Sequence, residues 1–531
     1  IEVDARVFSG CENLKKIIIS QSVTGSINNI LYGIPNIEIV EIAAENTNYT
    51  LSGVLPVVYN AKGNVIEIVF GNMDEANMFI NGEFVIDPNA DRIGAYAFNG
   101  QIGLKKVYIP DTIRKIPEGA FINCYNLEEV MFYKTQAAAD GSGREAVLID
   151  GNYVKAEKTL LSVIGTSAFA GCKSLKKFDI PSDVNTIEAY AFSGAGLTEI
   201  TIPNSVTMLE SYIFYGCVDL KKATVKSNIM GDYMFRYCTA LYDVTISEEV
   251  TTIPTYAFAG CTSLKQIGLP QNLKSIKMDA FNASGLEEIV IGSQVSEINR
   301  NAFANNKNLA SVTFEENYVL VRFVGYSSKA FSGCTALTDV DLRPLKACTY
   351  LGINTFAESG ITSIYLPENV EHIGNTQDKP PALKDKTTQV FYNCKRLTTV
   401  YLPNKLQTIG GQVFFGCESL KKVVYDGYTG NSDFVLPSGL RLIAQEVYAG
   451  SGLVYADISA VANSANLGTG IFKDCTNLKE VALNTGITKL PDEMFSGCTS
   501  LENFDFAAFG KLSEIGAKVF QNTAIKSAEL R

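Results

Sequence analysis

The chain is 531 residues long, 46% of its residues are hydrophobic, and its formal net charge is −11. This hydrophobic content is enough for a buried core and excludes a disordered chain. The charge is modest and no block of Lys or Arg occurs, which argues against nucleic acid and against a basic membrane-binding patch. The longest apolar run falls well short of the roughly 18 residues that a membrane span needs.

The first residues, IEVDARVFSGCENL, already lie inside a repeat, and neither a starting Met nor a signal peptide precedes them. We therefore expect a processed or trimmed chain that has lost its targeting segment. The one histidine, His372, leaves little room for histidine catalysis or for a multi-histidine metal site, and we expect it in a surface turn. No nucleophile elbow, Walker loop or dinucleotide fingerprint is present, so the sequence predicts no cofactor, no metal and no enzyme.

One residue pattern recurs along the chain, for example in AFINCYNLEEVMF (120–132), AFAGCKSLKKFDIP (168–181) and AFAGCTSLKQIGLP (257–270). With the Phe of AF as the anchor, the repeat reads F-x-G-C-x-x-L-x-x-V-x-I-P, followed by a loosely apolar V-x-x-I. The anchors are Phe8, Leu31, Phe98, Phe121, Phe169, Phe192, Phe214, Phe235, Phe258, Phe281, Phe303, Phe331, Phe356, Phe391, Phe414, Tyr448, Phe472, Phe495 and Phe520. A fixed period of 21 to 23 residues between 192 and 303 is typical of a solenoid. We predict one continuous solenoid over 1–531 with about 19 turns, called rungs below.

The L-x-x-V-x-I part of each repeat predicts a β-strand. In LTEITIP (197–203), Ile200 and Ile202 point to one side, and Glu199 and Thr201 to the other. The proline ends the strand because it has no N–H for a neighbouring strand. Stacked rungs would join these strands into a parallel sheet with a spacing of about 4.8 Å.

The residue two places after the anchor predicts a tight turn. It is Gly, Asn or Asp ahead of almost every repeat cysteine, and these residues tolerate a positive φ. Tyr237 is the exception and would be strained in that conformation. Rungs that are one residue shorter, such as FSGAGL and FNASGL, also lack the cysteine.

The repeat resembles the BspA-like (Treponema pallidum-type) leucine-rich repeat, through its C-x-x-L-x-x-V-x-I-P half and through IGAYAF (93–98), IGTSAF (164–169) and IPTYAF (253–258). The resemblance covers nearly the whole chain. It implies a right-handed, β-rich superhelix with a parallel concave sheet and short turns on the convex side. The repeat differs from the commoner leucine-rich repeats, because it has neither their Asn after the strand nor their long convex helix.

Breaks in the period predict insertions, and NVIEIVF (64–70) inside the first of them looks like an extra strand. Their composition of Gly, Asp, Asn, Lys and Pro suits surface loops or hairpins. They lie near 43–90, 134–160, 315–326, 374–388 and 426–434.

Eleven of the twelve cysteines occupy one repeat position. Side chains at one repeat position stack in parallel, which suits a column of packed thiols better than crossed disulfides. Cys348 lies outside the pattern. The eleven are Cys11, Cys124, Cys172, Cys217, Cys238, Cys261, Cys334, Cys394, Cys417, Cys475 and Cys498.

The outward strand positions are the candidate binding residues. One row carries Lys and acids in neighbouring rungs, which favours either a solubilising charge ladder or a ligand-reading stripe. The next row includes Tyr108 and Met131, and later Tyr365 and Tyr401, which belong to adjacent rungs. Exposed neighbouring aromatics are common at binding hot spots, and the preference of strands for aromatics explains them as well.

These features predict a non-enzymatic binding protein. The family resemblance implies a secreted or cell-surface bacterial protein, an adhesin that binds host extracellular matrix or cell-surface proteins (such as fibronectin or fibrinogen) or other bacteria. Two alternatives remain open: a spacer that projects another domain, and a carbohydrate- or peptide-active enzyme that uses an insertion.

Overall fold

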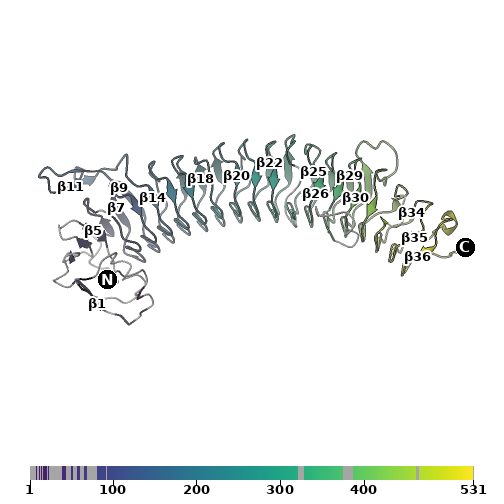
Figure 1. Cartoon of the computed structure of the whole chain (residues 1–531), viewed down its shortest axis with the longest axis horizontal. Coiled ribbons are helices and arrows are strands. Elements are labelled where there is room, and N and C mark those ends of the chain that lie inside the picture. Colours follow the sequence, from purple (N-terminus) through teal and green to yellow (C-terminus); the bar gives the residue numbers. More distant parts are fainter. Residues whose placement is uncertain are drawn as a thin grey trace. The chain divides into compact units, whose positions relative to one another are not determined.

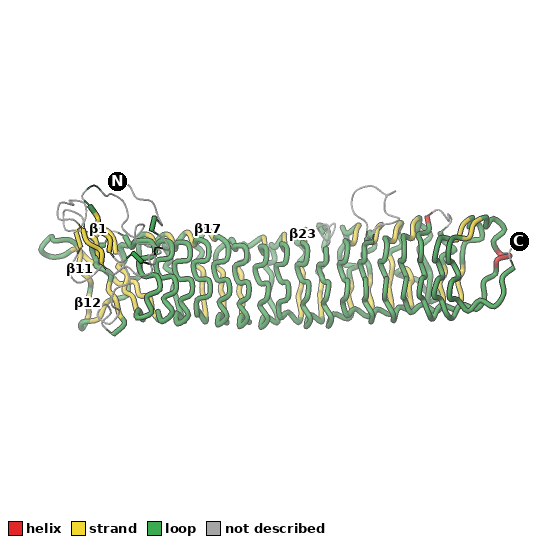
Figure 2. Tube along the Cα trace, turned by 90° about the horizontal axis from the view of Figure 1, so that it is seen from below, coloured by secondary structure: helices red, strands yellow, loops and turns green. Residues whose placement is uncertain are grey.

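The structure is a computed structural model that describes residues 81–90, 92–320, 328–374, 387–461 and 466–529, and short segments before residue 81. It contains two compact units, Ile1–Glu249 and Val250–Arg531. Each unit is a stack of rungs built from short strands and turns, which confirms the predicted repeat solenoid (Figure 1). Figure 2 shows the narrow strands between longer turn segments and a single-turn helix, Phe506–Ala508, near the C-terminal end.

Most of the predicted L-x-x-V-x-I strands form parallel pairs between rungs, as expected, but the segments 175–180 and 264–269 contain no strand. Their buried residues alternate with exposed ones, for example in Glu199–Ile202. In unit 1 these first strands are β6 (Glu83–Val85), β7 (Lys106–Pro110), β9 (Glu129–Tyr133), β16 (Glu199–Ile202), β18 (Lys222–Val225) and β19 (Asp243–Ile246). In unit 2 they are β22 (Glu288–Ile291), β24 (Ser311–Phe314), β25 (Asp339–Asp341), β27 (Ser363–Tyr365), β29 (Thr399–Leu402), β31 (Lys422–Tyr425), β33 (Tyr455–Asp457) and β34 (Glu480–Ala482).

A second set of parallel strands, each two residues long, comes from the V-x-x-I half of the repeat. The sequence indicated only a loosely apolar segment here. In unit 1 these second strands are β8 (Lys115–Ile116), β14 (Val163–Ile164), β15 (Thr186–Ile187) and β17 (Met208–Leu209). In unit 2 they are β20 (Thr252–Ile253), β21 (Ser275–Ile276), β23 (Glu297–Ile298), β26 (Tyr350–Leu351), β28 (His372–Ile373), β30 (Thr408–Ile409), β32 (Leu442–Ile443), β35 (Lys489–Leu490) and β36 (Glu514–Ile515). His372 therefore lies in a strand and is half-buried, with Nδ1 2.9 Å from Thr408 Oγ1, so its assignment to a surface turn was wrong.

The segment around each anchor is a turn that also bonds to the next rung. The backbone N–H of Phe121 donates to the Ala168 carbonyl at 2.8 Å, and that of Phe169 to the Ala191 carbonyl at 2.7 Å. The predicted positive φ two residues after the anchor is confirmed, including a φ of 62° at Tyr237. A second left-handed residue, two places before the anchor, was not predicted. It is often not glycine, as Tyr190, Tyr212 and Tyr233 show.

Within each unit, the anchors form a column of rings in the core. Successive anchor rings lie 4.8 to 5.9 Å apart, nearly parallel, within each unit. From Phe98 to Phe495 the described anchors are fully buried. Phe8 is exposed, and Leu31 lies outside the described residues.

The repeat cysteines form hydrogen bonds to the backbone of the turns and do not bond to one another. The Cys172 thiol donates to the Phe121 carbonyl at 3.1 Å, and Cys217 to that of Phe192 at 3.1 Å, so each thiol bonds the anchor one rung earlier. Asn306 replaces the cysteine in its rung and donates its amide to the Phe281 carbonyl at 2.8 Å. All twelve cysteines are free, and all are buried except Cys11, whose predicted burial was wrong.

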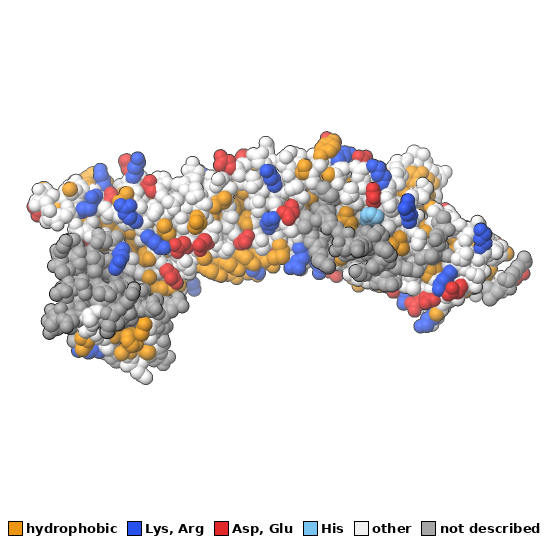
Figure 3. Space-filling view, viewed as in Figure 1, with side chains coloured by type: hydrophobic (Ala, Val, Ile, Leu, Met, Phe, Trp, Pro, Cys, Tyr) orange, Lys and Arg blue, Asp and Glu red, His pale blue; other side chains and the backbone are white. Residues whose placement is uncertain are grey.

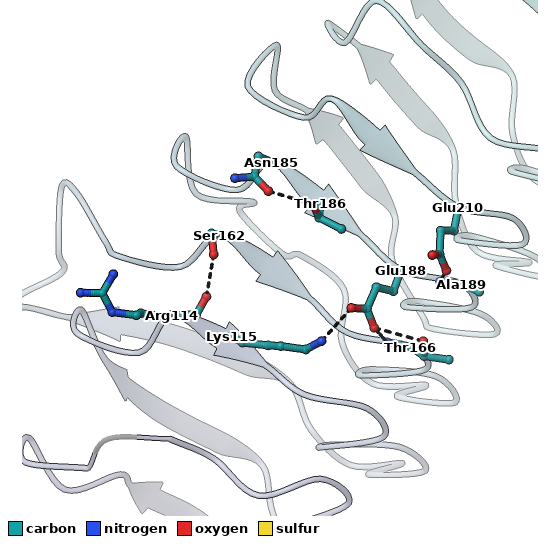
Figure 4. A network of polar contacts seen from close by, with 9 residues as sticks. All are labelled: Arg114, Lys115, Ser162, Thr166, Asn185, Thr186, Glu188, Ala189 and Glu210. Atoms are coloured by element: carbon teal, nitrogen blue, oxygen red, sulfur yellow. Dashed lines mark hydrogen bonds and ion pairs between the residues drawn. The ribbon is translucent and has the colours of Figure 1, made fainter.

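Acidic side chains link the turns of unit 1 (Figure 4). Directly after β15, Glu188 accepts from Lys115 Nζ at 2.7 Å through Oε1 and from the backbone N–H of Thr166 at 2.9 Å through Oε2. Partial burial opposes its ionisation, yet the bonds from Lys115 and Thr166 lower the pKa of Glu188. Glu210 repeats the arrangement one rung later and accepts from the backbone N–H of Ala189 at 2.8 Å.

Two insertions add their own elements to unit 1. Within 43–90, β3 (Thr50–Leu51), β4 (Val57–Tyr59) and β5 (Val65–Ile68) form an antiparallel sheet, so the predicted extra strand is present. Earlier in the chain, β1 (Lys16–Ile19) pairs in parallel with β2 (Ile39–Ile42). Segment 134–160 forms two hairpins, β10 (Thr135–Ala137) with β11 (Arg144–Ala146), and β12 (Leu148–Ile149) with β13 (Asn152–Tyr153). Most of 374–388 and part of 315–326 lie outside the described residues.

Burial predicts which thiols react. Desolvation raises the pKa of Cys334 and Cys348 to about 12, and the thiolate is the reactive form. We expect iodoacetamide to modify Cys11 in the native protein and to leave the ten buried repeat cysteines and Cys348 unmodified. In denaturant without reductant, mass spectrometry should count twelve modified cysteines. A lower count would show that disulfides form.

Leu264 tests the repeat assignment. It is fully buried, and a carboxylate in its place would have no partner in the core. We expect Leu264→Asp to lower the free energy of unfolding by about 4 kcal/mol or more, and to split the unfolding transition in two around that rung. Urea denaturation followed by circular dichroism measures both effects, and a variant as stable as the parent would show that the assignment is wrong.

Tyr448 has a buried hydroxyl that makes no hydrogen bond within the described part of the chain. Its ring is fully buried in the anchor column, its hydroxyl has no hydrogen-bond partner among the described residues, and burial raises its pKa. An unpaired buried polar group costs about 1 to 3 kcal/mol, so Tyr448→Phe should increase the free energy of unfolding by an amount of that order.

Tyr133 provides the matched control for this change. It is equally buried, but its hydroxyl donates to the Ile86 carbonyl at 2.5 Å. Tyr133→Phe should therefore destabilise the protein, whereas Tyr448→Phe stabilises it, in the same urea titration. Equal and negative effects of both changes would mean that the Tyr448 hydroxyl has a partner.

Candidate functional site

The two late tyrosines of the sheet face lie next to each other. Tyr365 at the end of β27 pairs with Tyr401 in β29, and their rings stack at a centroid distance of 4.0 Å and an angle of 1°. The residues before them, Ile364 and Val400, are buried, so the alternation of the strands directs the two tyrosines away from the core. Both rings are half-buried. Their mutual hydrogen bond and partial burial raise the pKa of Tyr365.

An arginine covers the free face of the tyrosine pair. The Arg343 guanidinium lies 4.2 Å from the centre of the Tyr365 ring. It also binds Asp341, with Nε 3.0 Å from Oδ1 and Nη2 2.8 Å from Oδ2. Asp341 pairs with Tyr365 in the sheet register, so the ion pair and the rings form one row across three rungs. Partial burial opposes the ionisation of Asp341, yet the bonds from Arg343 lower the pKa of its carboxyl.

The insertion at 426–434 lies on the other side of the pair. Tyr401 pairs with Val424 of β31, which is buried. The backbone of Val423 then bonds to Asp433 and Val435, so this segment takes the place of the next strand. Tyr425 and Tyr428 meet edge to face at 5.2 Å at the start of the insertion. The tyrosine pair therefore lies between the Arg343–Asp341 ion pair and an aromatic loop.

Tyr108 and Met131, which were predicted for the same outward row, do not form an exposed aromatic pair like Tyr365 and Tyr401. Tyr108 is only 9% exposed, because the Tyr153 ring of the 134–160 insertion packs on it at 4.7 Å. Met131 pairs with Tyr108 and is half-buried. The expectation of an open surface at Tyr108 was wrong, because the hairpin following β9 folds back over the sheet.

The charged row is paired across rungs. Lys106 lies 2.9 Å from Glu129, Lys222 3.6 Å from Asp243, and Lys177 4.0 Å from Glu199. Exposed pairs of this kind contribute about 0 to 1 kcal/mol each. The pairing favours the charge-ladder interpretation over a ligand-reading stripe.

Sequence reasoning missed Arg343 and the loop tyrosines. Arg343 lies just beyond the strand in DVDLRPL, and reading the strand rows side by side would have placed Asp341 next to Tyr365. Among the described residues, no group of three or more His, Cys, Asp or Glu side chains is arranged to hold a metal ion. No helix in the described part of the chain is long and apolar enough to cross a membrane.

Comparison with known proteins identifies the family. A model described as "BspA type Leucine rich repeat region (6 copies)" matches residues 1–53, 77–140, 157–238, 228–324, 263–377, 384–428 and 426–531. No curated protein matches the chain.

Solved structures of bacterial repeat proteins match this chain. A leucine-rich repeat protein from Bacteroides ovatus is 22% identical, with 89% of this chain and 90% of that chain covered and a TM-score of 0.44. A leucine rich cell surface protein from Faecalibacterium prausnitzii is 20% identical, with 88% and 97% covered and a TM-score of 0.30. A T. pallidum leucine-rich repeat protein is 22% identical, with 42% and 89% covered and a TM-score of 0.25. On the family match, which extends over most of its length, this chain belongs to the BspA-type leucine-rich repeat family.

Proposed function

We propose that this chain is a non-enzymatic binding protein that contacts a protein partner through the sheet face of unit 2. The observation that carries the proposal is the stacked pair Tyr365–Tyr401 beside Arg343. Tyr and Arg are enriched at binding hot spots, because they offer a large contact area together with polar groups. Stacking and the ion pair with Asp341 hold these side chains in place before a partner arrives, which lowers the entropic cost of binding.

The family supports the biological setting of this proposal. The resemblance to BspA-like proteins implies a secreted or cell-surface bacterial protein that acts as an adhesin. Its partners would be host extracellular matrix or cell-surface proteins, or the surface of other bacteria. The paired charges elsewhere on the sheet face leave the tyrosine pair as the surface best suited to specific contacts.

The double change Tyr365→Ala and Tyr401→Ala tests the site. A partner is first captured from extracts of host matrix and bacterial surfaces, and its affinity for parent and variant is then measured by titration calorimetry. We expect the variant to lose about 2 kcal/mol or more of binding free energy, which is typical of hot-spot truncation. Its melting curve should coincide with that of the parent, because neither ring lies in the core.

The matched control changes the same strand position in other rungs. Thr201→Ala and Thr245→Ala alter exposed residues of β16 and β19 and should leave the affinity unchanged. If the tyrosine variant binds as tightly as the parent while the melting curves coincide, the site is wrong and the insertions become the better candidates.

A further inference from the structure

The stacked pair Tyr365–Tyr401 is suited to a covalent reaction between its two rings. The two residues are paired in the register of the parallel strands β27 and β29, so their side chains leave the sheet in the same direction. Their rings are parallel within 1°, and the ring centroids are 4.0 Å apart. Because both rings start from paired strand positions, equivalent carbon atoms of the two phenols face each other. This arrangement favours oxidative coupling of the two tyrosines.

Oxidative coupling joins two tyrosines by a carbon–carbon bond. A one-electron oxidant removes one hydrogen atom, as a proton and an electron, from each phenolic O–H. The unpaired electron of each radical is shared with the ring carbons next to the oxygen, and two such carbons form the new bond. The hydrogens on these carbons then return to the oxygens through the solvent. The product, dityrosine, has lost two hydrogen atoms in total, and hydrogen peroxide that accepts them becomes two molecules of water.

The surroundings of the pair limit the partners of a radical on either ring. The Arg343 guanidinium covers the free face of Tyr365, at 4.2 Å from the ring centre. On the other side of the pair, Tyr401 is paired in register with Val424, which is buried. In the described part of the chain, no third aromatic ring contacts either tyrosine. The geometry therefore favours coupling within the pair over coupling to another ring or to another molecule.

Unit 1 contains stacked tyrosines with more than one possible partner. Tyr190, Tyr212 and Tyr233 stack in three successive rungs, at 4.7 Å and 4.2 Å. Tyr215 meets Tyr212 edge to face at 5.7 Å, and Tyr237 meets Tyr215 in the same way. Figure 3, in which tyrosine has the colour of the hydrophobic residues, shows such side chains gathered along the lower edge of the rungs. A radical in this group can pass from ring to ring, so we expect several products there and a single product at the pair in unit 2.

The thiols, which compete with phenols for oxidants, are protected. The thiolate is the form of cysteine that oxidants attack. All cysteines except Cys11 are buried, and desolvation raises the pKa of Cys334, for example, to about 12, which keeps its thiol protonated. Both tyrosines of the pair are only half-buried, so part of each ring faces solvent. An oxidant in solution therefore reaches the phenols of the pair more readily than the buried thiols.

A bond between these rings would tie two rungs together across an insertion. The rungs are those anchored by Phe356 and Phe391, and the 374–388 insertion lies between them in the sequence. A cross-link that closes a long loop restricts the unfolded chain and so stabilises the folded one, as disulfides do. Since all twelve cysteines are free, a dityrosine would be the first covalent link between rungs.

We propose that Tyr365 and Tyr401 form a dityrosine cross-link when the protein is exposed to a peroxidase with hydrogen peroxide, or to another one-electron oxidant of phenols. The reaction consumes one molecule of hydrogen peroxide, forms one bond between ring carbons next to the two hydroxyls, and releases two molecules of water. This modification goes beyond the binding role proposed above and does not depend on it, because it needs only the pair and the oxidant.

The experiment treats the whole chain, at low micromolar concentration, with a haem peroxidase and hydrogen peroxide. Trypsin places Tyr365 in peptide 347–384 and Tyr401 in peptide 397–405. We expect mass spectrometry to find these two peptides joined, with the loss of two hydrogen atoms, as the main product of both tyrosines. Dityrosine fluorescence should rise in parallel. Tyrosines of the pair that stay unmodified, or that are joined mainly to other peptides or other chains, would overturn the proposal.

Tyr401→Phe tests whether the pair is isolated. The variant keeps the ring that stacks on Tyr365 but has no phenol at this position, so its fold and melting temperature should match those of the parent. Tyr365 should then lose its partner, and peptide 347–384 should no longer appear in a cross-link through this residue. If Tyr365 couples to another ring of the chain as readily as before, the enclosure of the pair is wrong and the proposal fails.

Tyr242 controls for exposure alone. It is 50% exposed, and no other aromatic ring contacts it in the described part of the chain. It should react without cross-linking inside the chain, with a yield of cross-links at least about tenfold below that of the pair, because proximity governs coupling. Equal yields at Tyr242 and at the pair would show that exposure and not stacking decides the reaction, which would contradict the proposal.

Unfolding the chain before oxidation tests the role of the fold. In urea the two rings are no longer held together, and the yield of the cross-link between 347–384 and 397–405 should fall at least about tenfold. The same yield in folded and unfolded protein would count against the proposal. After oxidation of the folded protein, the midpoint of urea unfolding should rise. A midpoint that stays the same or falls would show that the bond does not tie the rungs in their native positions.

Discussion

The structure depends on hydrogen bonding between rungs. The first strands, the second strands and the anchor turns each pair their backbone groups with the neighbouring rung, as the N–H of Phe121 does with Ala168. A single rung has no other partner for these groups, and an unpaired buried backbone group is costly. Rungs are therefore stable only as a stack, in a register that places equal repeat positions directly above one another.

Because of this register, the residues at each repeat position form a column in which they make the same kind of contact. The anchors become a column of stacked rings, and the repeat cysteines become donors to the anchor carbonyl of the preceding rung. Asn306 shows what the cysteine position requires, because its amide makes the same bond to Phe281 without sulfur. The position selects a small buried donor, and a disulfide would remove the proton that each thiol donates.

The same register creates surface rows whose character depends on a few residues. On the sheet face, one outward row carries charges that are paired across rungs, and the next row carries the adjacent aromatic residues Tyr365 and Tyr401. On the turn face of unit 1, tyrosines fill a left-handed position that other rungs give to Ser167 or Asn301.

The sequence alone determined the repeat, most of the parallel first strands and the left-handed residue two places after the anchor, because these depend on contacts that recur from rung to rung. It also placed Tyr365 beside Tyr401, since adjacent rungs must align. The tertiary structure decided the contacts that belong to a single rung or insertion and do not follow the repeat. A hairpin from 134–160 covers Tyr108, Arg343 folds over Tyr365, and Tyr237 is held against Arg236. Repeat periodicity predicts the contacts between equivalent positions, but an insertion or a single long side chain reaches across rungs, and its contacts follow only from the folded chain.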